Sequence, residues 1–201
     1  MNLETPHGLA RAHVHAVETP VGALVLGHGA GGGVGARDLV TAMEVARSLG
    51  VTVVLVEQPY RVAGRRSPAP AAQLDAAWIA TVEQLRGSVG EVPLVVGGRS
   101  SGARVACRTA ARLGARGVLC LAFPLQPPQR RTGMRPPSRL HELDSAPVPT
   151  LVVQGARDPF GVPPPGDGRT IALVEADHSL RTDHAAIADA IRAWLPTVLR
   201  R

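Results

Sequence analysis

The chain has 201 residues, of which 45% are hydrophobic, and we expect a single domain spanning residues 1–201. Its two cysteines are too few for a disulfide framework and lack the C-x₂₋₄-C spacing of a Cys₂His₂ or Cys₄ zinc site, so both are expected to be reduced core thiols. The formal net charge is +6, yet the chain has no lysine and only 2% aromatic residues, which indicates a GC-rich genome rather than nucleic-acid binding.

Short apolar runs alternate with segments of helical periodicity along the chain. In chain order, the runs cover residues 23–26, 51–56, 92–96, 118–122, 150–153 and 171–174. Continuous apolar runs of this length are typical of strands that are buried on both faces of a sheet. The segments between and after them have apolar residues at helical spacing, namely Leu39, Met43, Ala46 and Leu49, then Leu74, Trp78, Val82 and Leu85, and last Ile187, Ile191, Trp194, Leu195 and Val198.

This order predicts an α/β fold, a three-layer sandwich in which helices cover a mostly parallel sheet of about six strands. Residues 12–17 are expected to add an antiparallel N-terminal edge strand. The Pro- and Arg-rich segment 123–139 is too short to form a separate cap domain, so none is expected. Segment 162–168 is expected to be an irregular crossover.

Residues 98–102, with the sequence GRSSG, lie between a predicted strand and a predicted helix and fit the G-x-S-x-G pattern of a nucleophile elbow. Strand and helix approach so closely at this turn that the residues two before and two after the nucleophile must be tiny. Ser100 has glycine at both positions, whereas Ser101 has Arg99 and Ala103. Ser100 is therefore the candidate nucleophile, and a serine that only caps the helix is the structural alternative.

A nucleophilic serine needs a base to accept its proton and an acid to orient that base. In enzymes with this elbow, the acid and then the histidine follow the serine along the chain. Asp158 and His178 follow Ser100 in this order, and each lies just after a predicted strand. Asp177 is an alternative acid, but it directly precedes His178, and His184 falls within the last predicted helix. The sequence thus predicts a triad of Ser100, Asp158 and His178.

The glycine-rich loop at residues 27–33 supports a competing hypothesis. Its glycines fit G-x-G-x-x-G directly after a strand, and Glu57 lies where an NAD(P)-dependent oxidoreductase has its ribose-binding acid. Against this, His28 occupies a position where a pyrophosphate needs bare backbone, and residues 33–35 delay the start of the next helix. We therefore interpret the segment as an oxyanion loop.

Together these segments resemble the α/β-hydrolase superfamily over nearly the whole chain. The resemblance rests on LGHGAGG at residues 26–32, GRSSG at 98–102, GARDPFG at 155–161 and ADHSL at 176–180. The pattern is similar to the small lidless branch related to dienelactone hydrolases, and to a subgroup that also contains a chromatin-complex scaffold subunit. Dienelactone hydrolases have a cysteine nucleophile where this chain has a serine, so their substrate is not carried over.

The resemblance implies Ser100 as nucleophile, Asp158 as acid and His178 as base. It also implies an oxyanion hole formed by the backbone N–H groups of Ala30 and Ser101. The leading hypothesis is a serine hydrolase that cleaves a carboxylic ester, lactone or thioester through an acyl-enzyme. The alternatives are a non-catalytic scaffold with this fold and, more distantly, an NAD(P)-dependent oxidoreductase.

Arg99, beside the candidate nucleophile, and Gly31 are candidate substrate-binding residues, although Arg99 could instead pair with an acid such as Glu57. Two arginine-rich loops, at residues 61–66 and 130–139, are expected at the same edge, which favours an anionic small-molecule acyl substrate; the alternative is that these loops are solvated and reflect an arginine-rich proteome. No metal, cofactor or nucleic acid is expected. The chain start lacks a leader pattern and no apolar run approaches about 18 residues, which predicts a cytoplasmic protein without a membrane partner.

Overall fold

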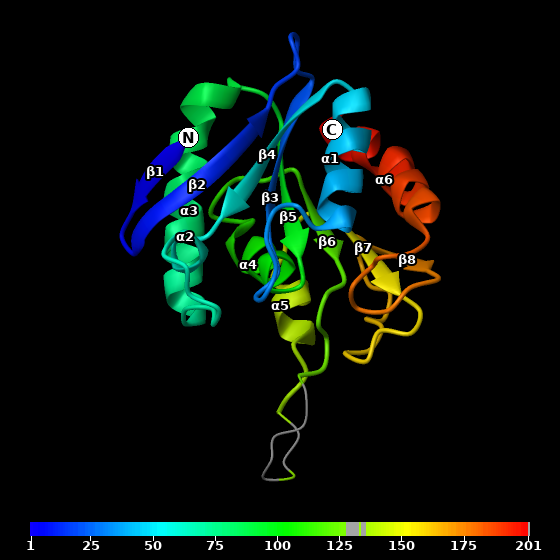
Figure 1. Cartoon of the computed structure of the whole chain (residues 1–201). Helices are drawn as coiled ribbons and strands as arrows, with labels where there is room; N and C mark the ends of the chain where they lie inside the picture. The colour runs from blue at the N-terminus through cyan, green and yellow to red at the C-terminus, as the bar shows by residue number, and fades with distance from the viewer. Residues whose placement is uncertain (128–132, 134–135, 201) are drawn as a thin grey trace.

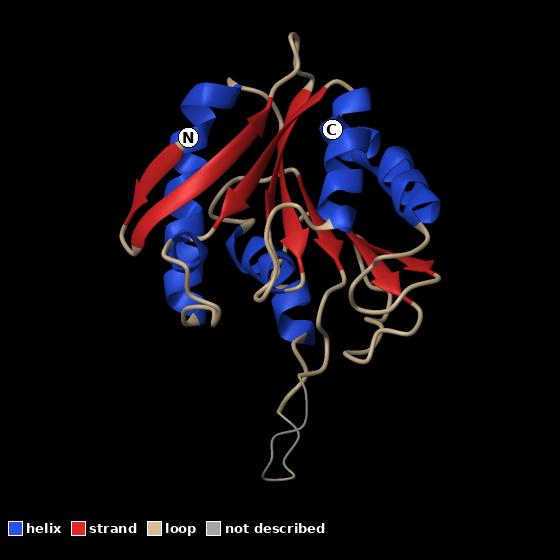
Figure 2. Ribbon diagram, in the orientation of Figure 1, coloured by secondary structure: helices blue, strands red, loops and turns tan. Residues whose placement is uncertain are grey.

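The computed structural model describes residues 1–127, 133 and 136–200. An eight-stranded sheet with the order β1-β2-β4-β3-β5-β6-β7-β8 forms its centre, and helices cover both faces of this sheet (Figure 1, Figure 2). The strands are β1 Asn2–Thr5, β2 Gly8–His15, β3 Gly22–Gly27, β4 Val51–Glu57, β5 Leu94–Arg99, β6 Gly117–Leu121, β7 Thr150–Gly155 and β8 Arg169–Val174. The helices are α1 Arg37–Ser48, α2 Pro59–Val62, α3 Ala71–Val89, α4 Ser101–Thr109, α5 Leu140–Asp144 and α6 His184–Leu199. The predicted three-layer α/β fold is confirmed.

The six predicted apolar runs correspond to the parallel strands β3 to β8. Every residue of β3, β6 and β7 is buried, as expected for strands covered on both faces. β5 extends past its predicted end to Arg99. It does so because Gly97 and Gly98, which have no side chain and so end the apolar run, still pair with Leu26 and Gly27 of β3.

The N-terminal side of the sheet differs from the prediction. The strand expected at residues 12–17 is β2, which starts earlier, pairs antiparallel with β4 and does not lie at the edge. The edge strand is β1, which pairs antiparallel with β2. β1 has no apolar run because it has four residues, of which only Leu3 is buried. The sheet therefore has two antiparallel strands beside six parallel ones.

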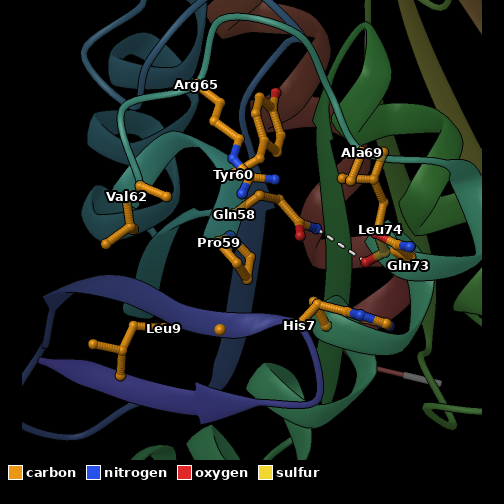
Figure 3. Close-up of a pocket in the computed structure, with 13 residues that line it drawn as sticks. His7, Leu9, Gln58, Pro59, Tyr60, Val62, Arg65, Ala69, Gln73 and Leu74 are labelled. Atoms are coloured by element: carbon orange, nitrogen blue, oxygen red, sulfur yellow. Dashed lines mark hydrogen bonds between the residues drawn. The ribbon is translucent and has the colours of Figure 1, made fainter.

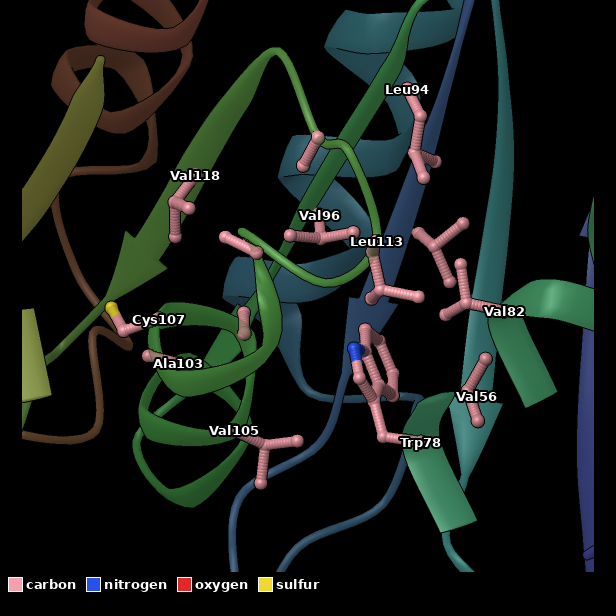
Figure 4. Close-up of a cluster of buried hydrophobic side chains, with 14 of the residues drawn as sticks. Val56, Trp78, Val82, Leu94, Val96, Ala103, Val105, Cys107, Leu113 and Val118 are labelled. Carbon is pink, nitrogen blue, oxygen red and sulfur yellow. The ribbon is translucent and has the colours of Figure 1, made fainter. Parts of the chain in front are cut away.

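One apolar cluster on each face of the sheet holds the helices in place. On one face, Trp78 and Val82 of α3 pack with Val96 of β5 and Ala103 of α4 (Figure 4). On the other face, α1 and α6 lie side by side over the sheet (Figure 1). Their buried side chains are Leu39, Ala42, Val45 and Ala46 from α1, and Ile187, Ile191, Trp194, Leu195 and Val198 from α6.

Both cysteines are free and fully buried, as expected. Cys107 lies on α4 and Cys120 on β6, with their Sγ atoms 3.5 Å apart. Burial raises the pKa of the Cys120 thiol, so it remains protonated. These thiols act as small apolar core residues beneath the helix that follows Ser100.

The topology brings several loops to one edge of the sheet. The chain leaves β3 for β4 on one side and then crosses to β5 on the other side of β3. The order of strands reverses at this point, which is where open α/β sheets bind ligands. The crossover from β7 to β8 contains no helix, as predicted. Its first residues, including Asp158, lie at the same edge as the end of β5, and the segment then returns to the start of β7, where the backbone N–H of Thr150 donates to the carbonyl oxygen of Gly168 at 2.7 Å (Figure 1).

Candidate active site

Ser100 lies at the turn between β5 and α4, where its backbone has φ 52° and ψ −106°. A positive φ is uncommon for a non-glycine residue, and such strain is concentrated at functional sites. A Cβ on Gly98 would lie 2.5 Å from the carbonyl oxygen of Gly27, and one on Gly102 would clash with the same oxygen. The close approach predicted for this turn is present, and Ser100 is the residue at its apex.

Three side chains from separate strand ends meet at this edge of the sheet. The Oγ of Ser100 is 3.0 Å from Nε2 of His178, and the Nδ1 of His178 is 2.8 Å from Oδ2 of Asp158. Asp158 lies in the loop after β7, and His178 lies in the loop after β8. With the proton on Nδ1 directed at the carboxylate, Nε2 is free to accept from the serine hydroxyl. The structure therefore brings the three predicted residues together.

Three groups donate to the side chain of Asp158, which has no exposed surface. Besides His178, its carboxylate accepts from the backbone N–H of Phe160 at 2.8 Å and from Nε2 of Gln154 at 2.7 Å. Gln154 is fully buried and also donates to the carbonyl oxygen of Gly161. The Phe160 ring packs on the ring of His178, with the centroids 4.4 Å apart. Sequence reasoning missed Gln154, although a glutamine that ends a buried apolar strand is a usable signal.

His28 fixes the backbone of the glycine-rich loop after β3. Its Nδ1 is 2.8 Å from the carbonyl oxygen of Gly29, and the backbone N–H of Gln58 donates to its Nε2 at 3.1 Å. A backbone N–H can only donate, so Nε2 is unprotonated and Nδ1 carries the proton. Burial lowers the pKa of His28, which keeps the ring neutral. This buried ring occupies the place that a dinucleotide pyrophosphate would need.

The same loop passes beside the candidate nucleophile. A Cβ on Gly29 would lie 3.6 Å from the Cβ of Ser100. The hydroxyl of Tyr60 donates to the carbonyl oxygen of Ala30 at 2.9 Å, and burial raises the pKa of Tyr60 to about 12, so it remains a donor. Within residues 1–127, 133 and 136–200, the backbone N–H groups of Ala30 and Ser101 form no hydrogen bond. Both are thus available as donors next to Ser100.

Arg99 connects three parts of the site. Its Nε lies 3.0 Å from Oδ2 of Asp38, a fully buried acid in the first turn of α1. Its Nη2 donates to the backbone carbonyl of His178 at 3.1 Å. Burial raises the pKa of Asp38, and the positive charge of Arg99 acts against this shift. Glu57, the acid expected as a partner of Arg99, instead lies 3.0 Å from Nε2 of His13.

A family model described as an alpha/beta hydrolase domain matches residues 20–189, which include Ser100, Asp158 and His178. The chain belongs to this alpha/beta hydrolase family. The match also covers all six parallel strands of the sheet. No protein with a curated description matches the sequence.

Solved structures share the fold of this chain at low sequence identity. An α/β serine hydrolase without a lid from Xanthomonas campestris is 21% identical, with TM-score 0.75, over 98% of this chain and 94% of its own. Est1E from Butyrivibrio proteoclasticus is 12% identical, with TM-score 0.80, over 100% of this chain and 99% of its own. A dienelactone hydrolase from Anabaena variabilis is 13% identical, with TM-score 0.76, over 98% of this chain and 95% of its own.

One cavity of the chain lies beside the three candidate residues and has a volume of about 630 Å³. Its lining residues are Gly31, Gly32, Ala36, Arg37, Arg99, Ser179 and Arg181. They include the immediate sequence neighbours of Ala30, Ser100 and His178. Both candidate substrate-binding residues, Gly31 and Arg99, are among them, whereas Arg37 and Arg181 were not predicted.

A second cavity, of about 340 Å³, lies between the β1–β2 turn, α2 and α3. Tyr60, Arg65 and Gln58 line it, and the side-chain amide of Gln58 donates to the carbonyl oxygen of Leu74 at 3.2 Å (Figure 3). Arg65 of the predicted arginine-rich loop thus belongs to this cavity and is not among the residues that line the cavity beside the triad.

The second arginine-rich loop is described only in part. Arg130, Arg131 and Arg135 lie outside the described residues, and Arg139 donates from Nη1 to the carbonyl oxygen of Pro124 at 3.1 Å. In the described part of the chain, no three His, Cys, Asp or Glu side chains form a group that could hold a metal ion. No helix of that part is long and apolar enough to cross a membrane.

Proposed function

We propose that this protein is a serine hydrolase that cleaves an ester-type bond, in a carboxylic ester, lactone or thioester, through an acyl-enzyme. The observation that carries the proposal is the continuous hydrogen-bonded path from Oγ of Ser100 through both nitrogens of His178 to the buried carboxylate of Asp158. A serine that only capped α4 would need no such path. The G-x-S-x-G turn and the hydrolase family of the chain support the same function.

In this mechanism, His178 accepts the hydroxyl proton at Nε2 while Ser100 Oγ attacks the substrate carbonyl carbon. Asp158 stabilises the imidazolium that forms and keeps the ring in place. The same histidine then donates its proton to the leaving oxygen or sulfur as the bond to the acyl carbon breaks. Water, deprotonated by His178, attacks the acyl-enzyme and releases the acid.

The free N–H groups of Ala30 and Ser101 would stabilise the oxyanion that develops during attack. In comparable sites, removing one such donor lowers kcat by about 10²–10³. The hydrogen bond from Tyr60 to the carbonyl of Ala30 supports this role, because it fixes the peptide planes of the loop. Gln58 adds to this through its bond to the neutral His28.

Hydrolysis of para-nitrophenyl acetate by two matched variants tests the proposal. We expect Ser100→Ala to lower kcat/KM by at least about 10³-fold, because the nucleophile is lost. Ser101→Ala, which keeps the backbone N–H, should lower it by less than about tenfold. Thermal unfolding checks that both variants fold. Full activity in Ser100→Ala would overturn the proposal, and wild-type protein inert toward esters, thioesters and lactones would favour the scaffold hypothesis.

A further inference from the structure

The cavity beside the triad is where the part of a substrate beyond the scissile bond would lie. Its lining includes Gly31 next to Ala30, Arg99 next to Ser100 and Ser179 next to His178. The Cα atoms of these three lining residues are each about 3.8 Å from the Cα atom of Ala30, Ser100 or His178. A substrate acylating Ser100 can therefore extend into this cavity.

The charged side chains that line the cavity are all arginines: Arg37, Arg99 and Arg181. Only the charge of Arg99 is compensated, by the buried carboxylate of Asp38 at 3.0 Å. Arg37 and Arg181 are exposed, and neither forms an ion pair with any residue that the structure describes. The cavity thus carries two uncompensated positive charges.

The acids nearest to Arg181 in the sequence form no ion pair with it, and Asp38, the neighbour of Arg37, pairs with Arg99. The carboxylate of Asp177 accepts from the backbone N–H of Ser179 at 2.7 Å, and that of Asp183 accepts from the backbone N–H of Glu175 at 2.9 Å. The carboxylate of Glu175 lies 2.8 Å from Arg157. Each is therefore already engaged by another group. Among other exposed arginines, Arg157 and Arg192 have carboxylate partners, whereas Arg47, Arg65 and Arg66 form no ion pair with the described residues.

We propose that this cavity binds an anionic group of the substrate, a carboxylate or a phosphate, through Arg37 and Arg181. The inference rests on the proposed serine hydrolase function and narrows its substrate class to anionic esters. A guanidinium can donate two parallel hydrogen bonds to such a group. Arg37 at the start of α1 and Arg181 before α6 approach it from separate elements, which fixes its distance from Ser100. This assigns the anion to Arg37 and Arg181 rather than to the arginine-rich loops or to Arg99.

The test compares mono-para-nitrophenyl glutarate with para-nitrophenyl pentanoate, two esters of equal acyl length of which only the first carries a carboxylate. We expect wild type to have the higher kcat/KM for the glutarate ester, and the ratio to fall as ionic strength rises through about 0.15 M. Arg37→Gln and Arg181→Gln should each lower the ratio about tenfold, because each removes one charged hydrogen-bond donor. Arg192→Gln removes the same charge elsewhere and should leave the ratio unchanged.

Equal kcat/KM values for the two wild-type esters, or a ratio unaffected in the Arg37→Gln/Arg181→Gln double variant, would overturn the inference. Calorimetric titration of the wild-type protein with glutarate and with inorganic phosphate measures anion binding without catalysis. It therefore distinguishes failure of the anion site from failure of the hydrolase proposal. Binding that is lost in the double variant supports the anion site even if neither ester is cleaved, and the tighter of the two ligands identifies the anion. Absence of binding to wild type overturns the site independently of catalysis.

Discussion

At the scale of single residues, hydrogen bonds to Asp158 fix the position of the acid beside His178. Its carboxylate is completely buried, and Gln154, Phe160 and His178 all donate to it. These hydrogen bonds hold the carboxylate against His178, and an acceptor at this position keeps the proton of His178 on Nδ1. The role of Asp158 could be predicted from its place after β7, but that of Gln154 could not. Gln154 contacts Asp158 because the loop after β7 folds back on the end of this strand, and the sequence does not show that fold of the loop.

Asp158→Asn tests this orientation. Asparagine can donate where the carboxylate accepts, so the wrong tautomer of His178 is favoured and kcat should fall by about 10⁴. Asp177→Asn is the matched control, because Asp177 is adjacent to His178 but hydrogen-bonds only to the backbone of Ser179 among the described residues. Steady-state kinetics on para-nitrophenyl acetate measures both. A large loss in Asp177→Asn with near-normal turnover in Asp158→Asn would assign the acid to Asp177.

At the scale of elements, most strands could be predicted, but side-chain contacts between different elements could not. Six parallel strands are visible as apolar runs, and in β3 to β7 this is because both faces of the strand are buried. β8 has an apolar run although it lies at the edge and only its Val174 is buried. β1 is not visible, because only Leu3 of its four residues is buried. The pair of Asp38 in α1 and Arg99 in β5 also escapes prediction, since it depends on how a helix packs over a distant strand. For the same reason, the sequence suggested Glu57 as the partner of Arg99.

The contact between the loop after β3 and the end of β4 is expected to be sensitive to pH. Burial lowers the pKa of His28 from its usual 6.5, so the unfolded chain binds a proton at a higher pH than the folded protein does. The contribution of neutral His28 to the stability of the folded protein is therefore complete above pH 6.5 and is lost as pH falls from there toward the lowered pKa. Between these two pKa values, the free energy of unfolding falls by at most about 1.4 kcal/mol for each pH unit of acidification.

Urea unfolding of wild type and His28→Gln between about pH 7.5 and 5 measures this effect. Glutamine keeps an acceptor for the N–H of Gln58 but does not titrate, so the wild type should lose more stability on acidification than the variant. His7→Gln, which removes an exposed histidine, should follow the wild type. Parallel pH profiles for wild type and His28→Gln would show that His28 is not the group responsible.

For the whole molecule, the position of the site follows from the sheet. Loops after β3, β5, β7 and β8 carry Ala30, Ser100, Asp158 and His178 to one edge. Lids of α/β hydrolases are inserted after the strand that corresponds to β6, and the segment between β6 and α5 is too short here to form a folded cap. The site is therefore expected to be open, and no long apolar tunnel is expected above Ser100.

Acyl chain length tests this openness. A buried methylene contributes about 0.8 kcal/mol, so an enzyme with a tunnel gains specificity with each added carbon. Without one, kcat/KM on para-nitrophenyl esters should stop rising after short chains and should not increase from butyryl to palmitoyl. Assays below the critical micelle concentration avoid artefacts of aggregation. A steady rise in kcat/KM up to the palmitoyl ester would contradict an open site.

The central claim, that Ser100 is a nucleophile activated by His178, is tested most directly by mapping the adduct of a fluorophosphonate probe by peptide mass spectrometry. A serine without a base reacts negligibly with such a probe, so labelling reports activation itself and needs no knowledge of the substrate. We predict a single adduct on Ser100, abolished in Ser100→Ala, strongly reduced in His178→Gln and retained in Ser101→Ala. An adduct on Ser101, or equal labelling of wild type and Ser100→Ala, would contradict the claim.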